Sequence, residues 1–162
     1  MLNRKLNIVS FKCGPDYIDP MFHTEVIGTK SRNLDSFFSD SDTLRYLLHK
    51  NSLNSDLAII EGVMGYYDGI GGISTDGSSY HVASVTKTPV ILVVNCKGMS
   101  LSILSLIKGF LTYKEDSGIK GVILNQISPM IYKELKQLIE EQLSVKVLGY
   151  LPNVKEFTIE SR

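Results

Sequence analysis

Five short apolar runs, separated by segments of helical periodicity, constrain the fold of this chain most strongly. The run at residues 90–95, Val-Ile-Leu-Val-Val-Asn, is apolar at consecutive positions rather than at alternating ones. A strand of this kind is covered on both faces, as strands are in parallel sheets flanked by helices. The other runs lie at 6–13, 56–61, 120–125 and 145–150. The alternation predicts an α/β fold, a parallel sheet of five strands with helices on both faces.

The segments between these strands carry helix signals of different strength. A helix is predicted from about residue 42 to 50, another at 79–87, a third at 99–113, and a fourth from the Ser128-Pro129 start to about 143. Residues 14–39 contain two prolines and a polar cluster and are predicted to be irregular. Residues 62–79 hold six glycines and predict a long loop, a length that is usually functional or disordered.

Composition places the chain among ordinary globular domains and excludes several functions. A length of 162 residues predicts one domain over 1–162. A formal net charge of zero argues against a nucleic-acid surface or binding to an anionic membrane. No apolar run reaches the ~18 residues of a membrane span. Cys13 and Cys96 form no Cys-x-x-Cys pair, and the three histidines lack metal-binding spacing. We therefore expect a reduced, cytoplasmic protein without a zinc site.

Carboxylates follow two of the predicted strands. Asp16 and Asp19 come after the first strand, whereas Glu61 ends the second and Asp68 lies seven residues further on. Parallel strands end at a common edge, where ligands bind, so these groups are expected to converge. Clustered carboxylates repel one another unless a cation lies among them, and oxygen-rich sites suit Mg²⁺ beside nucleotide phosphates. Lys12 would add a point charge for phosphate. The alternative is a set of solvated loop carboxylates.

Several motifs, in one order, resemble those of the cobyrinic acid a,c-diamide synthase family. They are Lys12-x-Gly-Pro-Asp-Tyr-Ile-Asp-Pro20 with His23, Ser31-Arg-Asn-Leu-Asp35, Glu61-Gly-Val-Met-Gly-x-Tyr-Asp-Gly69, Gly121-Val-Ile-Leu-Asn125, Gly149-Tyr-Leu-Pro152 and Glu160-Ser-Arg162. The resemblance implies a ligase of cobalamin biosynthesis with a dethiobiotin synthetase-like P-loop NTPase fold. Such an enzyme uses ATP, Mg²⁺ and glutamine-derived ammonia to amidate the a and c carboxylates of cobyrinic acid.

The resemblance also implies roles for individual residues. Asp16, Asp19, Glu61 and Asp68 match the family's catalytic acidic residues, and Asp19 and Glu61 would hold the metal.

Nucleotide and substrate contacts are implied in the same way. Lys12 and Asn125 would bind ATP, with Asn125 matching an asparagine that reads adenine; a strand-end turn former is the alternative. Tyr17 and Ile18 match positions that touch the corrinoid. Arg32 would pair with a substrate carboxylate, unless it is simply a surface arginine. His23 and His81 match the family pattern, although packing or capping explains them equally well.

Two expected parts of the family are missing from this sequence. It contains no Gly-x-x-x-x-Gly-Lys-[Ser/Thr] phosphate loop and no amidotransferase domain with its cysteine nucleophile. We therefore expect a partial synthetase domain, inactive alone and binding ATP weakly or not at all. The missing first strand is expected beside the strands at 6–13 and 56–61. Its loss predicts a marginally stable chain with a gap in the sheet, pairing with another copy or aggregation.

Two other functions share this pattern. One is the amidation of nickel-sirohydrochlorin by the related a,c-diamide synthase. The other is a non-catalytic module that binds a corrinoid or a protein partner.

Overall fold

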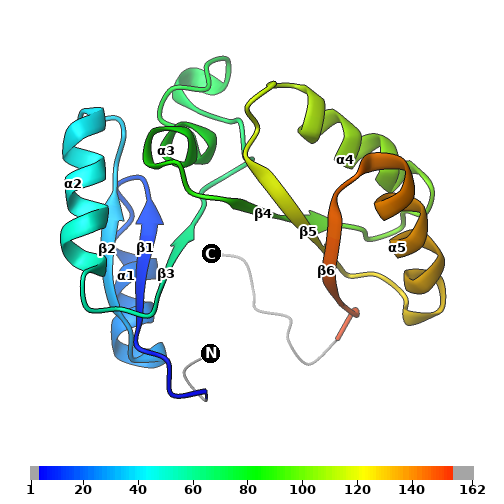
Figure 1. Cartoon of the computed structure of the whole chain (residues 1–162), viewed down its shortest axis with the longest axis horizontal. Coiled ribbons are helices and arrows are strands. Elements are labelled where there is room, and N and C mark those ends of the chain that lie inside the picture. The colour runs from blue at the N-terminus through cyan, green and yellow to red at the C-terminus, as the bar shows by residue number, and fades with distance from the viewer. Residues whose placement is uncertain (1–3, 155–162) are drawn as a thin grey trace. The chain divides into compact units, whose positions relative to one another are not determined.

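Strands and helices alternate along the chain, and every strand pairing is parallel (Figure 1). The structure, a computed structural model, describes residues 4–154. It divides into two compact units, Met1–Thr88 and Pro89–Arg162, which are described separately. The α/β class with parallel strands and flanking helices is confirmed. The single domain over 1–162 stays a prediction, and the Glu160–Arg162 motif lies outside the described residues.

The first unit contains a three-stranded sheet in the order β2-β1-β3. Its strands are β1 (Ile8–Cys13), β2 (Lys30–Leu34) and β3 (Leu57–Glu61). Its helices are α2 (Ser41–Ser52) and α3 (Ser79–Thr86), together with the short α1 (Ile18–Phe22), the π-helical turn η2 (His23–Ile27) and the 3₁₀ turn η3 (Ile70–Gly72). Asp40 and Ser78 cap α2 and α3 by accepting from the backbone N–H groups of Thr43 and His81.

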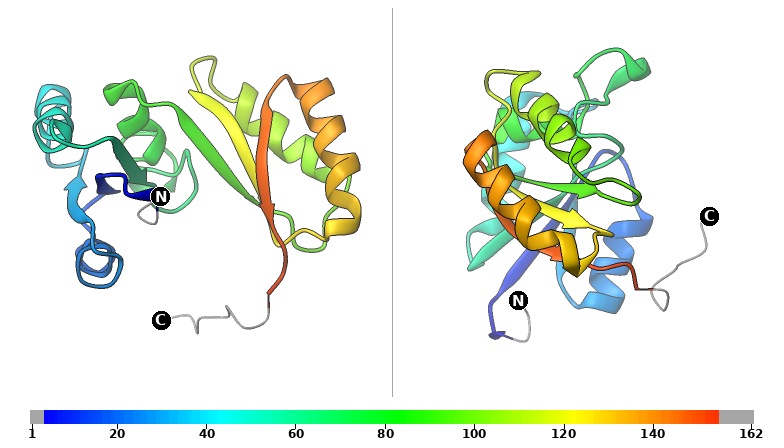
Figure 2. Two further views of the ribbon diagram at one scale, coloured as in Figure 1. Left: turned by 60° about the horizontal axis from the view of Figure 1, so that its bottom comes forward. Right: turned by 90° about the vertical axis from the view of Figure 1, so that its right-hand side faces the viewer.

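Alternate residues of β1 serve the two faces of this sheet. Val9, Phe11 and Cys13 are buried in a core with Leu44 of α2 and Val82 of α3. Ser10 and Lys12, which point to the opposite face, are also buried. The segment formed by α1 and η2 lies on that face, across the sheet from α2 (Figure 2). A lysine at this register position is therefore buried beneath α1 and η2.

The second unit contains a sheet in the order β4-β5-β6. Its elements are β4 (Val90–Asn95), α4 (Ser102–Thr112), β5 (Ile119–Asn125), α5 (Pro129–Leu143) and β6 (Lys146–Leu151). Helices α4 and α5 cover the same face of this sheet (Figure 2). Consequently Leu92 and Val94 are buried, whereas their neighbours Ile91 and Val93 are more than half exposed.

The expected count of five strands is wrong. Residues 4–154 form six strands, because the segment predicted to be irregular contains β2. They are grouped in two three-stranded sheets, one in each unit. The first strand is paired on both sides, by β2 and β3. A missing strand therefore cannot lie beside β1 as expected, and the outer strands of that sheet are β2 and β3.

The predicted helices agree more closely with the structure, although α1 and η2 were missed. Pro20 occupies the first turn of α1, where a proline costs no internal hydrogen bond. Within the described residues, no helix is long and apolar enough to cross a membrane.

Candidate functional site

Lys12 is the centre of a polar cluster at the carboxyl end of the first sheet. Its Nζ lies 2.8 Å from Asp19 Oδ2 and 3.3 Å from Glu61 Oε1. It also donates to the carbonyl oxygen of Gly62 at 3.0 Å. The Lys12 side chain is only 6% exposed. An ammonium group has three protons, and these three acceptors match them.

Glu61 is held from two sides. It is the last residue of β3 and stands opposite Lys12 in the parallel register. One carboxylate oxygen faces Lys12, and the other, Oε2, lies 2.8 Å from His23 Nε2. His23 Nδ1 lies 3.4 Å from the hydroxyl of Ser31 on β2. Residues from β1, β2, β3, α1 and η2 thus meet in one chain of polar contacts.

The electrostatics of Lys12 balance two opposing effects. Burial by itself would lower the pKa of its ammonium, but hydrogen bonds and charge from Asp19 and Glu61 outweigh burial and raise the pKa above its usual 10.5. The ammonium therefore remains charged at neutral pH. It holds together two carboxylates that would otherwise repel each other.

The cation between Asp19 and Glu61 is thus the ammonium of Lys12. Among residues 4–154, no group of three or more His, Cys, Asp or Glu side chains is arranged to hold a metal ion. Asp16 instead accepts from the backbone N–H of Ile18 at 2.8 Å and of Asp19 at 3.5 Å, which fixes the start of α1. Sequence spacing placed the carboxylates at the right strand ends but did not reveal this ion pair.

Two of the expected substrate residues adjoin this cluster, whereas Arg32 pairs in register with Phe11 and so belongs to the other face of the sheet from Lys12. Tyr17 and Ile18, directly before Asp19, are 72% and 42% exposed. Arg32 lies on β2, and its Nη1 donates to the carbonyl oxygen of Ser31 at 2.7 Å. An exposed ring and an exposed apolar side chain beside charged groups form a surface able to contact a large amphipathic ligand.

Asp68 belongs to a loop with its own internal contacts. Its Oδ2 accepts from the backbone N–H of Gly65 at 3.1 Å. The rings of Tyr66, Tyr67 and Tyr80 pack together, with centroids 4.7 to 5.9 Å apart. A side chain on Gly69 would collide with the backbone carbonyl oxygen of Asp76, so the chain can follow this path only with glycine there. The glycine-rich segment is therefore a folded loop.

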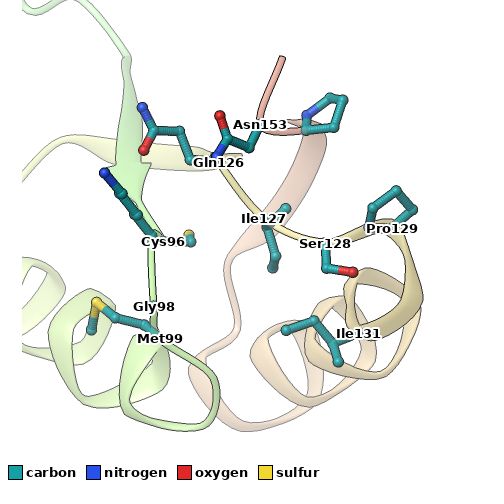
Figure 3. A pocket seen from close by; sticks show the side chains of 11 residues that line it. Cys96, Gly98, Met99, Gln126, Ile127, Ser128, Pro129, Ile131 and Asn153 are labelled. Carbon is teal, nitrogen blue, oxygen red and sulfur yellow. The ribbon is translucent and has the colours of Figure 1, made fainter. Parts of the chain in front are cut away.

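A second candidate site lies in the other unit. A cavity of about 400 Å³ opens where β4, β5 and β6 end (Figure 3). Ile127, Met99 and Ile131 give it apolar walls, and Gln126 and Asn153 add amides. Asn125 ends β5 next to this cavity, where its carbonyl accepts from the N–H of Cys96 at 2.8 Å. The sequence analysis did not predict Gln126 and Asn153 as site residues. Their positions just beyond strand ends could have indicated it, because ligands bind beyond the carboxyl ends of parallel strands.

The two thiols are not activated in this structure. Both are free and buried. Burial raises the pKa of Cys13 to about 11 and also raises the pKa of Cys96. A protonated, buried thiol is a poor nucleophile.

A family model described as an AAA domain matches residues 30–161. Because the match covers most of the chain, the protein belongs to this family, which has a P-loop-type α/β fold.

The curated relatives are more specific. The chain is 42% identical over 163 residues to a cobyrinate a,c-diamide synthase of Methanocaldococcus jannaschii, covering 99% of this chain and 37% of the relative. It is 44% identical to a protein of that name from Caldanaerobacter subterraneus, covering 100% of this chain and 36% of the relative. A Priestia megaterium protein of the same name is 41% identical, covering 96% and 34%. The family resemblance seen in the motifs is confirmed, and the chain spans little more than a third of these relatives' length.

Proposed function

We propose that this chain forms part of the synthetase region of an ATP-dependent ligase that amidates the a and c side-chain carboxylates of cobyrinic acid. The supporting observation is the Lys12–Asp19–Glu61 cluster, in a chain 41–44% identical to three proteins named cobyrinate a,c-diamide synthase. In this reaction ATP phosphorylates a substrate carboxylate to an acyl phosphate. Ammonia then attacks the acyl carbon, and phosphate leaves.

The chemistry of the two carboxylates fits magnesium. Glu61 and Asp19 are 46% and 33% exposed, so both carboxylates are accessible to a ligand from solvent. Mg²⁺ is usually bound by one or two carboxylates, waters and substrate phosphates. Asp19 and Glu61 would hold it, and the ion would neutralise charge on the phosphoryl oxygens. Lys12 would fix both carboxylates and add positive charge toward the phosphates.

The other site residues keep the roles implied by the family. Asp16 and Asp68 complete the acidic set, whereas Tyr17, Ile18 and Arg32 would contact the tetrapyrrole. Asn125 would bind adenine beside the cavity at residues 96–99 and 126–131, which combines apolar walls with amide groups.

The proposal extends to parts outside this chain. Ammonia would come from glutamine through an amidotransferase domain, and the chain alone would be inactive. The two free thiols fit a reducing cytoplasm. Pairing of two copies through open sheet edges is part of the same proposal.

The test is amidation by a protein of the relatives' full length that carries this segment. With cobyrinic acid, ATP, Mg²⁺ and glutamine, we expect the diamide by mass spectrometry. Asp19→Asn or Glu61→Gln should remove far more activity than Tyr17→Phe. Equal losses in all three would contradict separate roles for metal and substrate residues. Turnover of nickel-sirohydrochlorin alone would reassign the substrate, and corrinoid binding without any turnover would indicate a binding module.

A further inference from the structure

We propose that His23 is a positioning residue, which fixes the orientation of the Glu61 carboxylate. The inference rests on the proposed function, in which Glu61 is a residue of the amidation site. Its evidence is the 2.8 Å contact between His23 Nε2 and Glu61 Oε2.

The two contacts of Glu61 define its orientation. Lys12 binds Oε1 and His23 binds Oε2, so both oxygens are anchored and the carboxylate cannot rotate about its terminal bond without breaking one contact. Glu61 is otherwise 46% exposed, and such a side chain samples several rotamers when unpaired. With His23 in place, the outer lone pairs point in one direction.

The buried surroundings of His23 select the useful tautomer. Its side chain is 13% exposed, and its Nδ1 faces the hydroxyl of Ser31, which is buried on β2. The Glu61 carboxylate can only accept, so Nε2 carries the proton at this contact, and the Nδ1 of a neutral ring can then accept from the Ser31 hydroxyl. A residue that hydrogen-bonds to a metal-ligating side chain fixes the orientation of that side chain. Its loss typically lowers activity or metal affinity by about 10–100-fold.

The backbone of His23 is also fixed. Its carbonyl oxygen accepts from the backbone N–H groups of Gly28 and Thr29 and from the Thr29 hydroxyl. These bonds close the π-helical turn η2, a rare conformation that is frequent at functional sites. Gly28, at φ 78°, permits the turn to end there. The turn places the imidazole of His23 beside Glu61 at the end of β3.

The first experiment reads the contact without turnover. Long-range ¹H–¹⁵N correlation spectra of the chain should show His23 protonated on Nε2, with a shift of that nitrogen in Glu61→Gln and of Nδ1 in Ser31→Ala. His49, exposed on α2, should respond to neither substitution. An Nε2 without a proton, or an Nε2 resonance indifferent to Glu61→Gln, would overturn the inference.

The second experiment measures amidation by a full-length protein carrying this segment. His23→Leu should lower kcat by about 10–100-fold with little change in the KM of the tetrapyrrole. His23→Gln, whose amide N–H can reach Glu61, should restore most of that loss, and His49→Leu should behave as wild type. If His23→Leu does not fold, Ser31→Ala should still lower kcat severalfold, since it removes only the partner of Nδ1.

The two experiments separate the inference from the proposed function. A wild-type protein without any amidation would overturn the function, while the spectra would still support the positioning of Glu61. An active enzyme in which His23→Gln is as impaired as His23→Leu would overturn the positioning role and leave the function standing.

Discussion

At the scale of single residues, the stability of the first unit depends on Lys12. Lys12→Met should lower the free energy of unfolding by about 1–3 kcal/mol, because Asp19 and Glu61 would face each other without a cation and Gly62 would lose a donor. The estimate is below that for a fully buried pair, since both carboxylates reach solvent. Urea unfolding measures it, with Lys30→Met, exposed on β2, as the control. An equal effect of the two substitutions would contradict a special role for Lys12.

The same ion pair predicts an alkaline dependence of stability. The pKa of Lys12 is raised above 10.5 in the folded protein because its two carboxylate partners outweigh burial. The stabilisation from this shift is therefore fully present below pH 10.5 and is lost as the pH rises through the folded-state pKa. The difference in unfolding free energy between wild type and Lys12→Met should thus be constant from pH 7 to 10 and shrink above ~10.5. A difference that stays constant through this range would contradict the ion pair.

At the scale of elements, apolar runs were sufficient to locate five of the six strands that residues 4–154 form. They missed β2, in which only Ser31 and Leu34 are buried, because a mostly polar strand carries no apolar run. The site was partly predictable for the same reason. Strand ends placed Asp19 and Glu61 near one edge, but the direction of the Lys12 side chain follows from the register of β1 against β3 and from the helix above it. Neither is visible in local sequence.

Strand β4 offers a test of which sheet face is covered in solution. Val94 is buried at 3% exposure, and its neighbour Val93 is 58% exposed on the opposite face. Val94→Ala should cost roughly 1–3 kcal/mol through lost packing, whereas Val93→Lys should cost less than about 0.5 kcal/mol. Charge on exposed sheet positions also opposes association, so Val93→Lys should reduce light scattering. Similar destabilisation by both would show that the Val93 face is covered in solution.

At the scale of the whole molecule, the division into two sheets bears on ligand binding. Parallel sheets bind ligands at their carboxyl edges, and each unit carries its own candidate site at such an edge, the Lys12 cluster in one and the cavity near Asn125 in the other. Ligand binding at each of these two candidate sites can be tested in the 162-residue chain.

The last prediction is that this chain binds ATP weakly or not at all. P-loop sites hold phosphates chiefly through backbone N–H groups and a lysine in the motif Gly-x-x-x-x-Gly-Lys-[Ser/Thr], and this sequence contains no such motif. Two carboxylates around Lys12 add net negative charge, which opposes phosphate binding unless Mg²⁺ is present. Isothermal titration with MgATP should therefore give a Kd weaker than about 1 mM, equivalent to less than ~4 kcal/mol. A full-length protein carrying the segment is the positive control. Micromolar binding by the 162-residue chain would show that its own residues form a complete nucleotide site.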